Sequence, residues 1–166
     1  MSQQPTHSEA IKKINELIKG KNIAMLTSVC EDGHFHARPM AVLDVDFDGD
    51  LWFFTRKDAP KVDQIQQEPR VNVAYSDPAN QDYVSLAGKA RLVVDQALNE
   101  KYWQPQFEAW FADGLEDPQL SLLKIEVEGA EYWDSPSSTV AHIKGFIQTK
   151  ITGDHEQVGD HAKVDI

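Results

Sequence analysis

The segment HFHARPMAVLDVDFDGDLWFFTRKDAPK, residues 34–61, decides the predicted fold of this chain. From Phe35 to Val45 every odd position is apolar, whereas the even positions include Arg38 and Met40. Alternation with a period of two is typical of a β-strand that has one face in a core. We therefore predict a strand whose odd-numbered face is buried. Its other face carries Arg38 beside Met40, a cation next to an apolar side chain that suits a flat, phosphorylated ligand.

Turn signals and aromatic residues extend this strand into a hairpin and then a helix. Asp48-Gly49 is a typical turn sequence, and Leu51–Thr55 is rich in aromatic residues, which favour strands. The sequence Asp58-Ala59-Pro60 then predicts the start of a helix, with Asp58 as its N-cap and the proline in its first turn. Pro69 is expected to end this helix.

The remaining elements follow from the same patterns. Thr6 and Glu9 are spaced as a capping box, and apolar residues at helical spacing follow them up to Ile18. Alternating apolar residues predict four more strands, at Asn22–Val29, Val71–Tyr75, Val84–Val94 and Leu123–Trp133. Tight turns join most of these strands, and no glycine-rich dinucleotide fingerprint occurs. We therefore predict a mainly β protein with helices, a six-stranded antiparallel barrel rather than alternating βαβ units.

Composition and charge restrict the class of protein. A chain of 166 residues with 41% hydrophobic residues is expected to form one domain with a sizeable core. The net charge of −11 argues against non-specific nucleic-acid binding, which needs clustered cations. No apolar run of bilayer length and no leader-like segment occurs, and the single cysteine, Cys30, fits a reducing compartment. We therefore expect a cytoplasmic protein whose partners include neither nucleic acid nor a membrane.

Other reactive side chains are expected to have no chemical role. His34 and His36 share a strand face, but no cysteine or carboxylate pair near them completes a ligand set, so we expect no metal site. Cys30 lacks an activating base nearby in the sequence and is interpreted as a small packing residue.

A phosphate site is one interpretation of the cations in the opening segment. Thr55 offers a hydroxyl at the end of a strand, and Lys61 lies about one turn into the next helix, where backbone amides are free to donate. Arg38 on the neighbouring strand can add a forked contact. The alternative, a solvated charged face beside an ordinary helix cap, explains the same residues.

Five motifs resemble those of a known family. They stand in the order Arg38-Pro39-Met40, Leu51–Thr55, Lys61, Trp110–Gly114 and Glu131–Pro136. This order resembles the general stress protein 26-like family of the pyridoxamine 5′-phosphate oxidase-like, FMN-binding split-barrel superfamily. The resemblance runs from roughly Glu9 to Val140. It implies a Greek-key split barrel over residues 1–140, followed by a weakly ordered or peripheral tail, residues 141–166.

The resemblance also implies a cofactor and a set of residues that bind it. FMN would lie at the interface of a homodimer, with its phosphate held by Arg38 and Lys61 beside Thr55. Met40 and Phe54 would line the ring and the ribityl chain, and Trp133 would approach the isoalloxazine ring from the partner chain. The implied cofactor-binding set is Arg38, Pro39, Met40, Phe54, Thr55, Lys61 and Trp133. An exposed set of Trp103, Trp110 and Trp133 would suit a dimer interface, whereas core packing is the alternative for the first two.

The implied activity is that of an FMN-dependent oxidoreductase acting on a small molecule, with no catalytic residue assigned. Two alternatives stay open: a non-catalytic flavin-binding protein for sensing or buffering, and a split barrel that holds FAD, deazaflavin or haem. Pyridoxamine phosphate oxidases use arginines near the C-terminus, whereas this chain has no arginine after Arg91. Asp134 would in addition repel a phosphate, so vitamin B6 oxidation is not expected.

Overall fold

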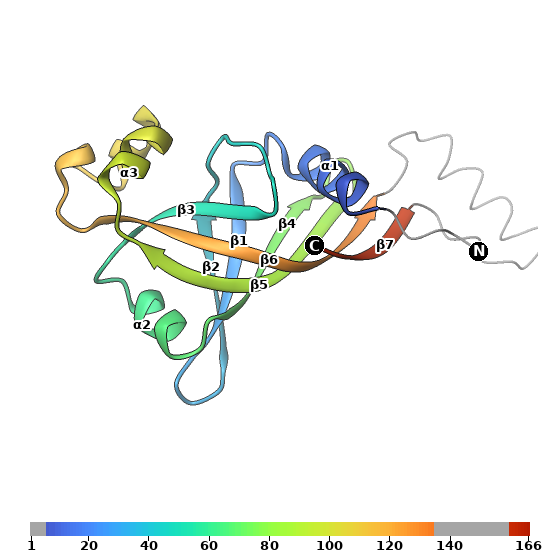
Figure 1. Ribbon diagram of the computed structural model, residues 1–166, viewed down its shortest axis with the longest axis horizontal. Coiled ribbons are helices and arrows are strands. Elements are labelled where there is room, and N and C mark those ends of the chain that lie inside the picture. Colours follow the sequence, from blue (N-terminus) through green and yellow to red (C-terminus); the bar gives the residue numbers. More distant parts are fainter. Residues whose placement is uncertain (1–5, 135–159) are drawn as a thin grey trace, which may run out of the picture.

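The structure is a computed structural model that describes residues 6–134 and 160–166. Within these residues one antiparallel sheet curls into a half-barrel (Figure 1). The strands are β1 Ile23–Val29, β2 Phe35–Ala41, β3 Asp50–Arg56, β4 Arg70–Asp77, β5 Asp82–Val93, β6 Leu120–Asp134 and β7 Asp160–Asp165. Their hydrogen-bonded order is β2-β1-β4-β5-β6-β3, and β7 pairs with β6. The predicted fold class and all six predicted strands are confirmed.

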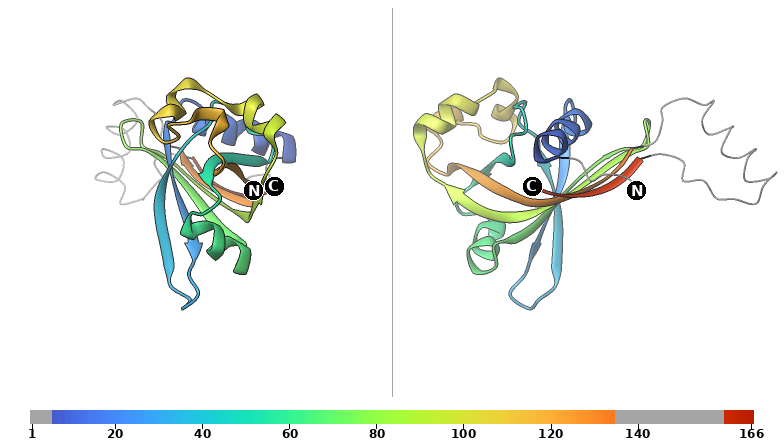
Figure 2. Two further views of the ribbon diagram at one scale, coloured as in Figure 1. Left: turned by 90° about the vertical axis from the view of Figure 1, so that its left-hand side faces the viewer. Right: turned by 45° about the vertical axis from the view of Figure 1, so that its right-hand side comes forward.

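Short helices surround this sheet. They are α1 His7–Ile18, α2 Pro60–Gln67 and α3 Gln96–Tyr102, with 3₁₀ helices η1 Pro105–Ala109 and η2 Gly114–Glu116. α1 lies toward the end of the sheet that carries β7, whereas α2 and α3 lie toward the other end (Figures 1 and 2). The predicted capping box of α1 is confirmed, because Thr6 and Glu9 bond reciprocally. Within the described ranges, no helix is long and apolar enough to cross a membrane.

The β1–β2 hairpin shows that the predicted alternation is right but that the buried face is the opposite one. Met40 is 6% exposed, whereas Phe35 is 79% exposed. The register pairs Met40 with Ala24 and Arg38 with Leu26, both buried residues of β1. The even-numbered face of β2 therefore looks into the half-barrel. Because β2 is the terminal strand of the sheet order and projects from the body (Figure 2), the described chain leaves its odd-numbered face uncovered.

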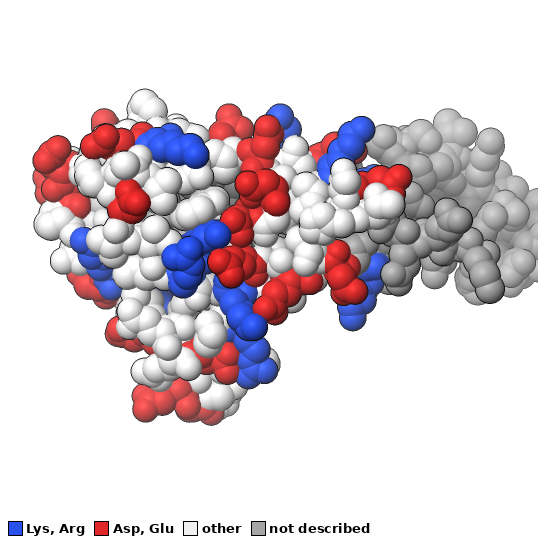
Figure 3. Space-filling view, viewed as in Figure 1, with Lys and Arg blue, Asp and Glu red and all other residues white. Residues whose placement is uncertain are grey.

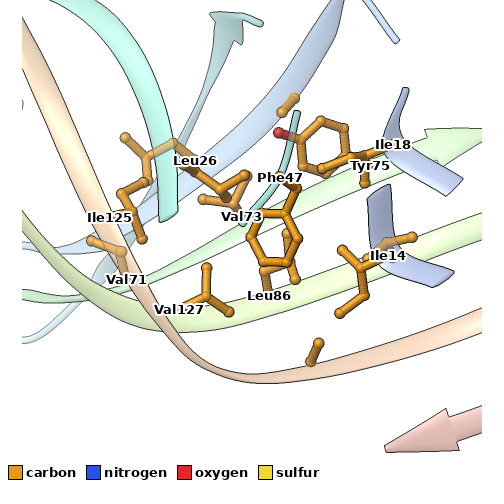
Figure 4. Packing of buried hydrophobic residues seen from close by; sticks show 14 of the residues in the cluster. Ile14, Ile18, Leu26, Phe47, Val71, Val73, Tyr75, Leu86, Ile125 and Val127 are labelled. Carbon is orange, nitrogen blue, oxygen red and sulfur yellow. The ribbon is translucent and has the colours of Figure 1, made fainter. Parts of the chain in front are cut away.

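The main core fills the concave side of the half-barrel. Buried side chains from β1, β4, β5 and β6 meet there (Figure 4), and α1 covers them with Ile14 and Ile18. Leu26 and Leu86 are fully buried, and each such side chain stabilises the fold by roughly 1.5–3 kcal/mol. This core fixes the curvature that brings β2 and β3 near each other.

A second core lies at the end of the half-barrel near η1. The ring centroid of Phe54 in β3 lies 5.0 Å from that of Phe107 and 5.6 Å from that of Trp103, and both pairs are edge-on. Such aromatic pairs add roughly 0.5–1.5 kcal/mol beyond the area that they bury. Of the two alternatives for these tryptophans, Trp103 shows core packing, whereas Trp110 is 59% exposed.

The start of α2 differs from the prediction in its cap. The N-cap residue is Ala59, without a side-chain cap, and Pro60 occupies the first helical turn. Asp58 was the predicted N-cap, and that prediction is wrong. Its carboxylate instead accepts a 3.0 Å bond from Nε of Arg56, because the guanidinium two residues earlier is a stronger partner than an amide. α2 ends at Gln67, before Pro69, as predicted.

The chain returns to the sheet at its C-terminal end. Residues 160–165 form β7, an edge strand in which Asp165 pairs with Gly129 and Asp160 with Asp134. The predicted weakly ordered or peripheral tail began at residue 141, and its residues 141–159 lie outside the described ranges. The domain boundary at residue 140 therefore stays a prediction.

Gly88 occupies a position where only glycine fits. The β5–β6 register shifts between Ala87 and Gly88, and a Cβ on Gly88 would overlap the backbone carbonyl oxygen of Glu126. Because backbone atoms cannot rotate away, we expect Gly88→Ala to lower the free energy of unfolding by about 2 kcal/mol or more. Urea denaturation measures this change. Ala87→Ser, on the exposed neighbouring residue, serves as the control, and equal midpoints for both variants would contradict the expectation.

Candidate functional site: an aromatic cavity beside Arg38 and Lys61

A cavity of about 360 Å³ opens between β2, β3, the start of α2 and η1. Its size lies within the roughly 300–1,000 Å³ usual for small-molecule sites. Most of its wall is apolar and aromatic, with a hydroxyl and two cations as the polar part. The lining residues are Ile23, Pro39, Met40, Ala41, Phe54, Thr55, Arg56, Lys61, Phe107, Trp110 and Phe111. Such a wall suits a flat ring with one charged substituent.

Five of the seven predicted cofactor-binding residues line this cavity: Pro39, Met40, Phe54, Thr55 and Lys61. Arg38 precedes Pro39 on β2, and its Nη2 bonds to Gln64, one turn after Lys61 on α2, so the two cations lie near each other. The structure thus gathers the residues that the sequence pattern places on β2, β3 and α2.

Trp133 is the predicted residue that this chain does not bring to the cavity. Thr55 of the cavity pairs with Ser121 near the start of β6. Trp133 lies near the other end of this 15-residue strand, opposite Tyr83 and His161. A strand of that length extends about 50 Å, so Trp133 of the same chain stays remote from Lys61.

Among the residues that the structure describes, Arg38 bonds to neutral acceptors only. Its Nη1 donates a 2.7 Å bond to Oγ of Ser28, and its Nη2 donates a 3.0 Å bond to Oε1 of Gln64. A third, 3.5 Å contact reaches the carbonyl oxygen of Leu26. Burial lowers the pKa of Arg38, yet a guanidinium stays charged at neutral pH. The positive charge is therefore oriented without being neutralised.

Lys61 is the second cation of this candidate site. It is half-buried, and in the described part of the chain it has no hydrogen-bond acceptor and no carboxylate partner. Burial, followed by the neighbouring charge of Arg38, lowers the pKa of its ammonium group. Both effects disfavour the charged form. An anion bound between the two cations would favour the charged form and raise the pKa of Lys61 again.

Several other cations within the described ranges are paired with carboxylates, unlike Arg38 and Lys61. Arg56, also at the cavity, contacts Asp58 at 3.0 Å and Asp117 at 3.6 Å. Over β5 and β6 basic and acidic side chains alternate (Figure 3), as in the 2.9 Å contact between Lys89 and Glu128. In a protein of net charge −11, two adjacent cations without such partners indicate an anion site.

Sequence reasoning missed several members of this site. Ser28 is 1% exposed and reaches Arg38 only through the pairing of β1 with β2. Gln64 lies three residues after Lys61, and this helical spacing was an available signal. Phe107 and Phe111 are four residues apart, in η1 and just after it. The pattern placed them near each other but not against β3.

The other reactive groups that the structure describes are not gathered as metal ligands. In residues 6–134 and 160–166, no three His, Cys, Asp or Glu side chains lie together as metal ligands. His34 is exposed and contacts Asp32 at 3.0 Å. Cys30 is half-buried, and its Sγ lies 3.5 Å from Nε2 of Gln64.

The curled half-barrel with its cavity places this chain in the class of split-barrel proteins. A model described as "Pyridoxamine 5'-phosphate oxidase like" matches residues 9–157, so the chain belongs to the pyridoxamine 5′-phosphate oxidase-like family. General stress protein 26 of Bacillus subtilis (strain 168) is 28% identical over 132 residues, which cover 77% of this chain and 91% of that protein. This similarity confirms the general stress protein 26-like resemblance of the motifs.

Solved structures agree with this assignment. The general stress FMN/FAD binding protein from Xanthomonas citri is 34% identical, with a TM-score of 0.67, over 79% of this chain and 92% of that one. A crystal structure from Jannaschia sp. CCS1 has a TM-score of 0.77 and covers 96% of this chain and 99% of that one. It is 21% identical and shows the fold alone.

Proposed function

We propose that the protein binds FMN in this cavity and acts as a flavin-dependent oxidoreductase on a small molecule. The observation that carries the proposal is the pair of neighbouring cations, Arg38 and Lys61, that lack carboxylate partners beside an aromatic cavity. The description of the Xanthomonas citri relative as an FMN/FAD binding protein supports a flavin. Bound FMN would supply the electron transfer itself.

The residues of this chain would bind and orient the cofactor. Arg38 and Lys61 would hold the phosphate dianion, and the hydroxyl of Thr55 lies in the same cavity wall. Met40 and Phe54 would face the ring and the ribityl chain, where apolar contact excludes water. Among the described lining residues there is no carboxylate and no histidine, so their contribution is binding and orientation rather than proton transfer.

We further propose that a second copy of the chain completes the site. The odd-numbered side of the β1–β2 hairpin, here called the hairpin face, consists of Ile23, Met25, Phe35, Ala37 and Pro39. Its residues are exposed in the single chain, and large exposed apolar patches mark interfaces. Ile23 and Pro39 also line the cavity, so a partner on the hairpin face would lie against the ligand. Trp133, remote within one chain, would then come from the partner.

The test is a fluorescence titration of the purified protein with FMN and with riboflavin, which lacks the phosphate. Two charge-assisted contacts are worth roughly 1.5–3 kcal/mol each, so we expect FMN to bind at least about a hundredfold more tightly than riboflavin. Equal affinity for the two flavins would remove the phosphate site. Bleaching of bound flavin by a nicotinamide donor would support the oxidoreductase over a passive binder.

The same titration as a function of pH reports on Lys61. Its ammonium form binds phosphate, and its pKa in the ligand-free protein lies below the ordinary 10.5 because of burial and the charge of Arg38. Bound phosphate raises that pKa again. The part of the FMN preference that Lys61 contributes should thus be full below the ligand-free pKa and be lost as pH rises from there through the higher pKa of the FMN-bound protein. It should also fall below about pH 6, where the phosphate takes up a proton. A ratio that stays constant with pH would contradict the role of Lys61.

A further inference from the structure

We propose that Gln64, together with Ser28, is the positioning residue of the phosphate site. It holds the Arg38 guanidinium in place without neutralising its charge. This inference rests on the proposed binding of FMN and adds a residue that does not line the cavity itself.

The geometry is a closed triangle of three side chains. Ser28 Oγ donates a 2.7 Å bond to Oε1 of Gln64. The same two oxygens accept the 2.7 Å and 3.0 Å bonds from Nη1 and Nη2 of Arg38. Because Ser28 is 1% exposed and its side chain is short, the triangle leaves the guanidinium little freedom. A long arginine side chain otherwise loses much rotamer entropy when it is ordered.

The triangle also joins three elements of the fold. Ser28 belongs to β1, Arg38 to β2 and Gln64 to α2. Lys61 lies one turn earlier on α2, so the bond between Gln64 and Arg38 sets the spacing of the two cations. The amide nitrogen of Gln64 lies 3.5 Å from Sγ of Cys30. The amide oxygen, which accepts from Ser28 and Arg38, thus faces the guanidinium, while the nitrogen faces the sulfur.

The neutrality of the acceptors matters for function. A carboxylate at position 64 would form an ion pair with Arg38 and compete with a phosphate, as Asp58 and Asp117 do at Arg56. An amide oxygen orients the same donors but leaves the net charge in place. A guanidinium has five N–H donors, and the three contacts of Arg38 leave others for an anion.

The experiment compares Gln64→Met, Gln64→Glu and the control Gln66→Met, on an exposed glutamine of the same helix. FMN and riboflavin dissociation constants and the ligand-free melting temperature are measured for each. For Gln64→Met we expect FMN affinity to fall about tenfold, with riboflavin affinity unchanged. For Gln64→Glu we expect a larger loss of FMN affinity, while the melting temperature is equal or higher because the new carboxylate pairs with Arg38. Gln66→Met should match the wild type.

The outcomes separate this inference from the proposed function. Wild-type FMN affinity in Gln64→Met, or an equal loss for both flavins, overturns the positioning role and leaves the phosphate site intact. A wild-type protein that does not prefer FMN to riboflavin overturns both. If Gln64→Met does not fold, Ser28→Ala decides the question, since it removes the other corner of the triangle. A selective loss of FMN affinity in Ser28→Ala supports the inference, and its absence overturns it.

Discussion

Replacing both Arg38 and Lys61 with alanine is expected to raise the FMN dissociation constant by about a hundredfold or more. Each charge-assisted contact to a phosphate is worth roughly 1.5–3 kcal/mol, and a factor of ten corresponds to about 1.4 kcal/mol. Arg56, the other cation among the described lining residues, is already paired with Asp58 and Asp117. Isothermal titration calorimetry or quenching of flavin fluorescence measures the change.

A matched control removes two cations elsewhere. Lys89 and Arg91 of β5 pair with Glu128 and Glu126 on the outer face of the sheet. Changing both to alanine alters the net charge of the protein by the same amount, so it reports on long-range electrostatics alone. FMN affinity in this control should stay within a few-fold of the wild type. The phosphate site would be refuted if both double variants lost equal affinity, or if riboflavin binding fell as much as FMN binding.

The second large effect concerns the hairpin face. We expect Met25→Glu combined with Phe35→Glu to convert a dimer into a monomer. Met25 is 41% and Phe35 79% exposed in the single chain, so the isolated fold tolerates carboxylates there. In a two-fold interface each substitution occurs twice. Burying such charges without partners costs several kcal/mol, enough to raise the dimer dissociation constant by about a hundredfold or more.

Light scattering coupled to size-exclusion chromatography gives the mass of each variant. The control is Val94→Glu, which places the same charge on an apolar residue that is 63% exposed and lies outside the hairpin face. Because the hairpin face continues into the cavity, the monomeric variant should also bind FMN more weakly. A wild-type protein that stays monomeric at high concentration, or a double variant that keeps the dimer mass, would be incompatible with this assignment.

Local chemistry accounts for the parts of the fold that could be predicted. Alternation along β2, the capping box at Thr6 and the aromatic run of β3 depend on residues a few positions apart, and the structure retains all of them. The motifs around Arg38 and Lys61 likewise indicate the family from the sequence alone. Because residues close together in the chain determine these features, a single sequence is enough to predict them.

The features that the sequence pattern missed or misplaced depend on the folded surroundings. Period-two alternation cannot tell which face of β2 is buried, since that depends on whether another element covers the odd-numbered side. Asp58 pairs with a charged neighbour instead of capping α2. β7 adds to the edge of β6 from beyond residue 159. In each case the contact that forms is decided in the folded chain, and the local pattern does not specify it.

The cavity shows most clearly which features follow from the sequence and which depend on the tertiary structure. The order of residue types along the chain was enough to indicate strands, turns, a helix start and two cations that suit a phosphate. The triangle of Ser28, Gln64 and Arg38, the aromatic wall from η1 and the remote place of Trp133 arise only when the sheet curls and distant segments meet. Hydrogen bonds and charges act over a few ångströms, so their partners are set by folding in space rather than by spacing along the chain.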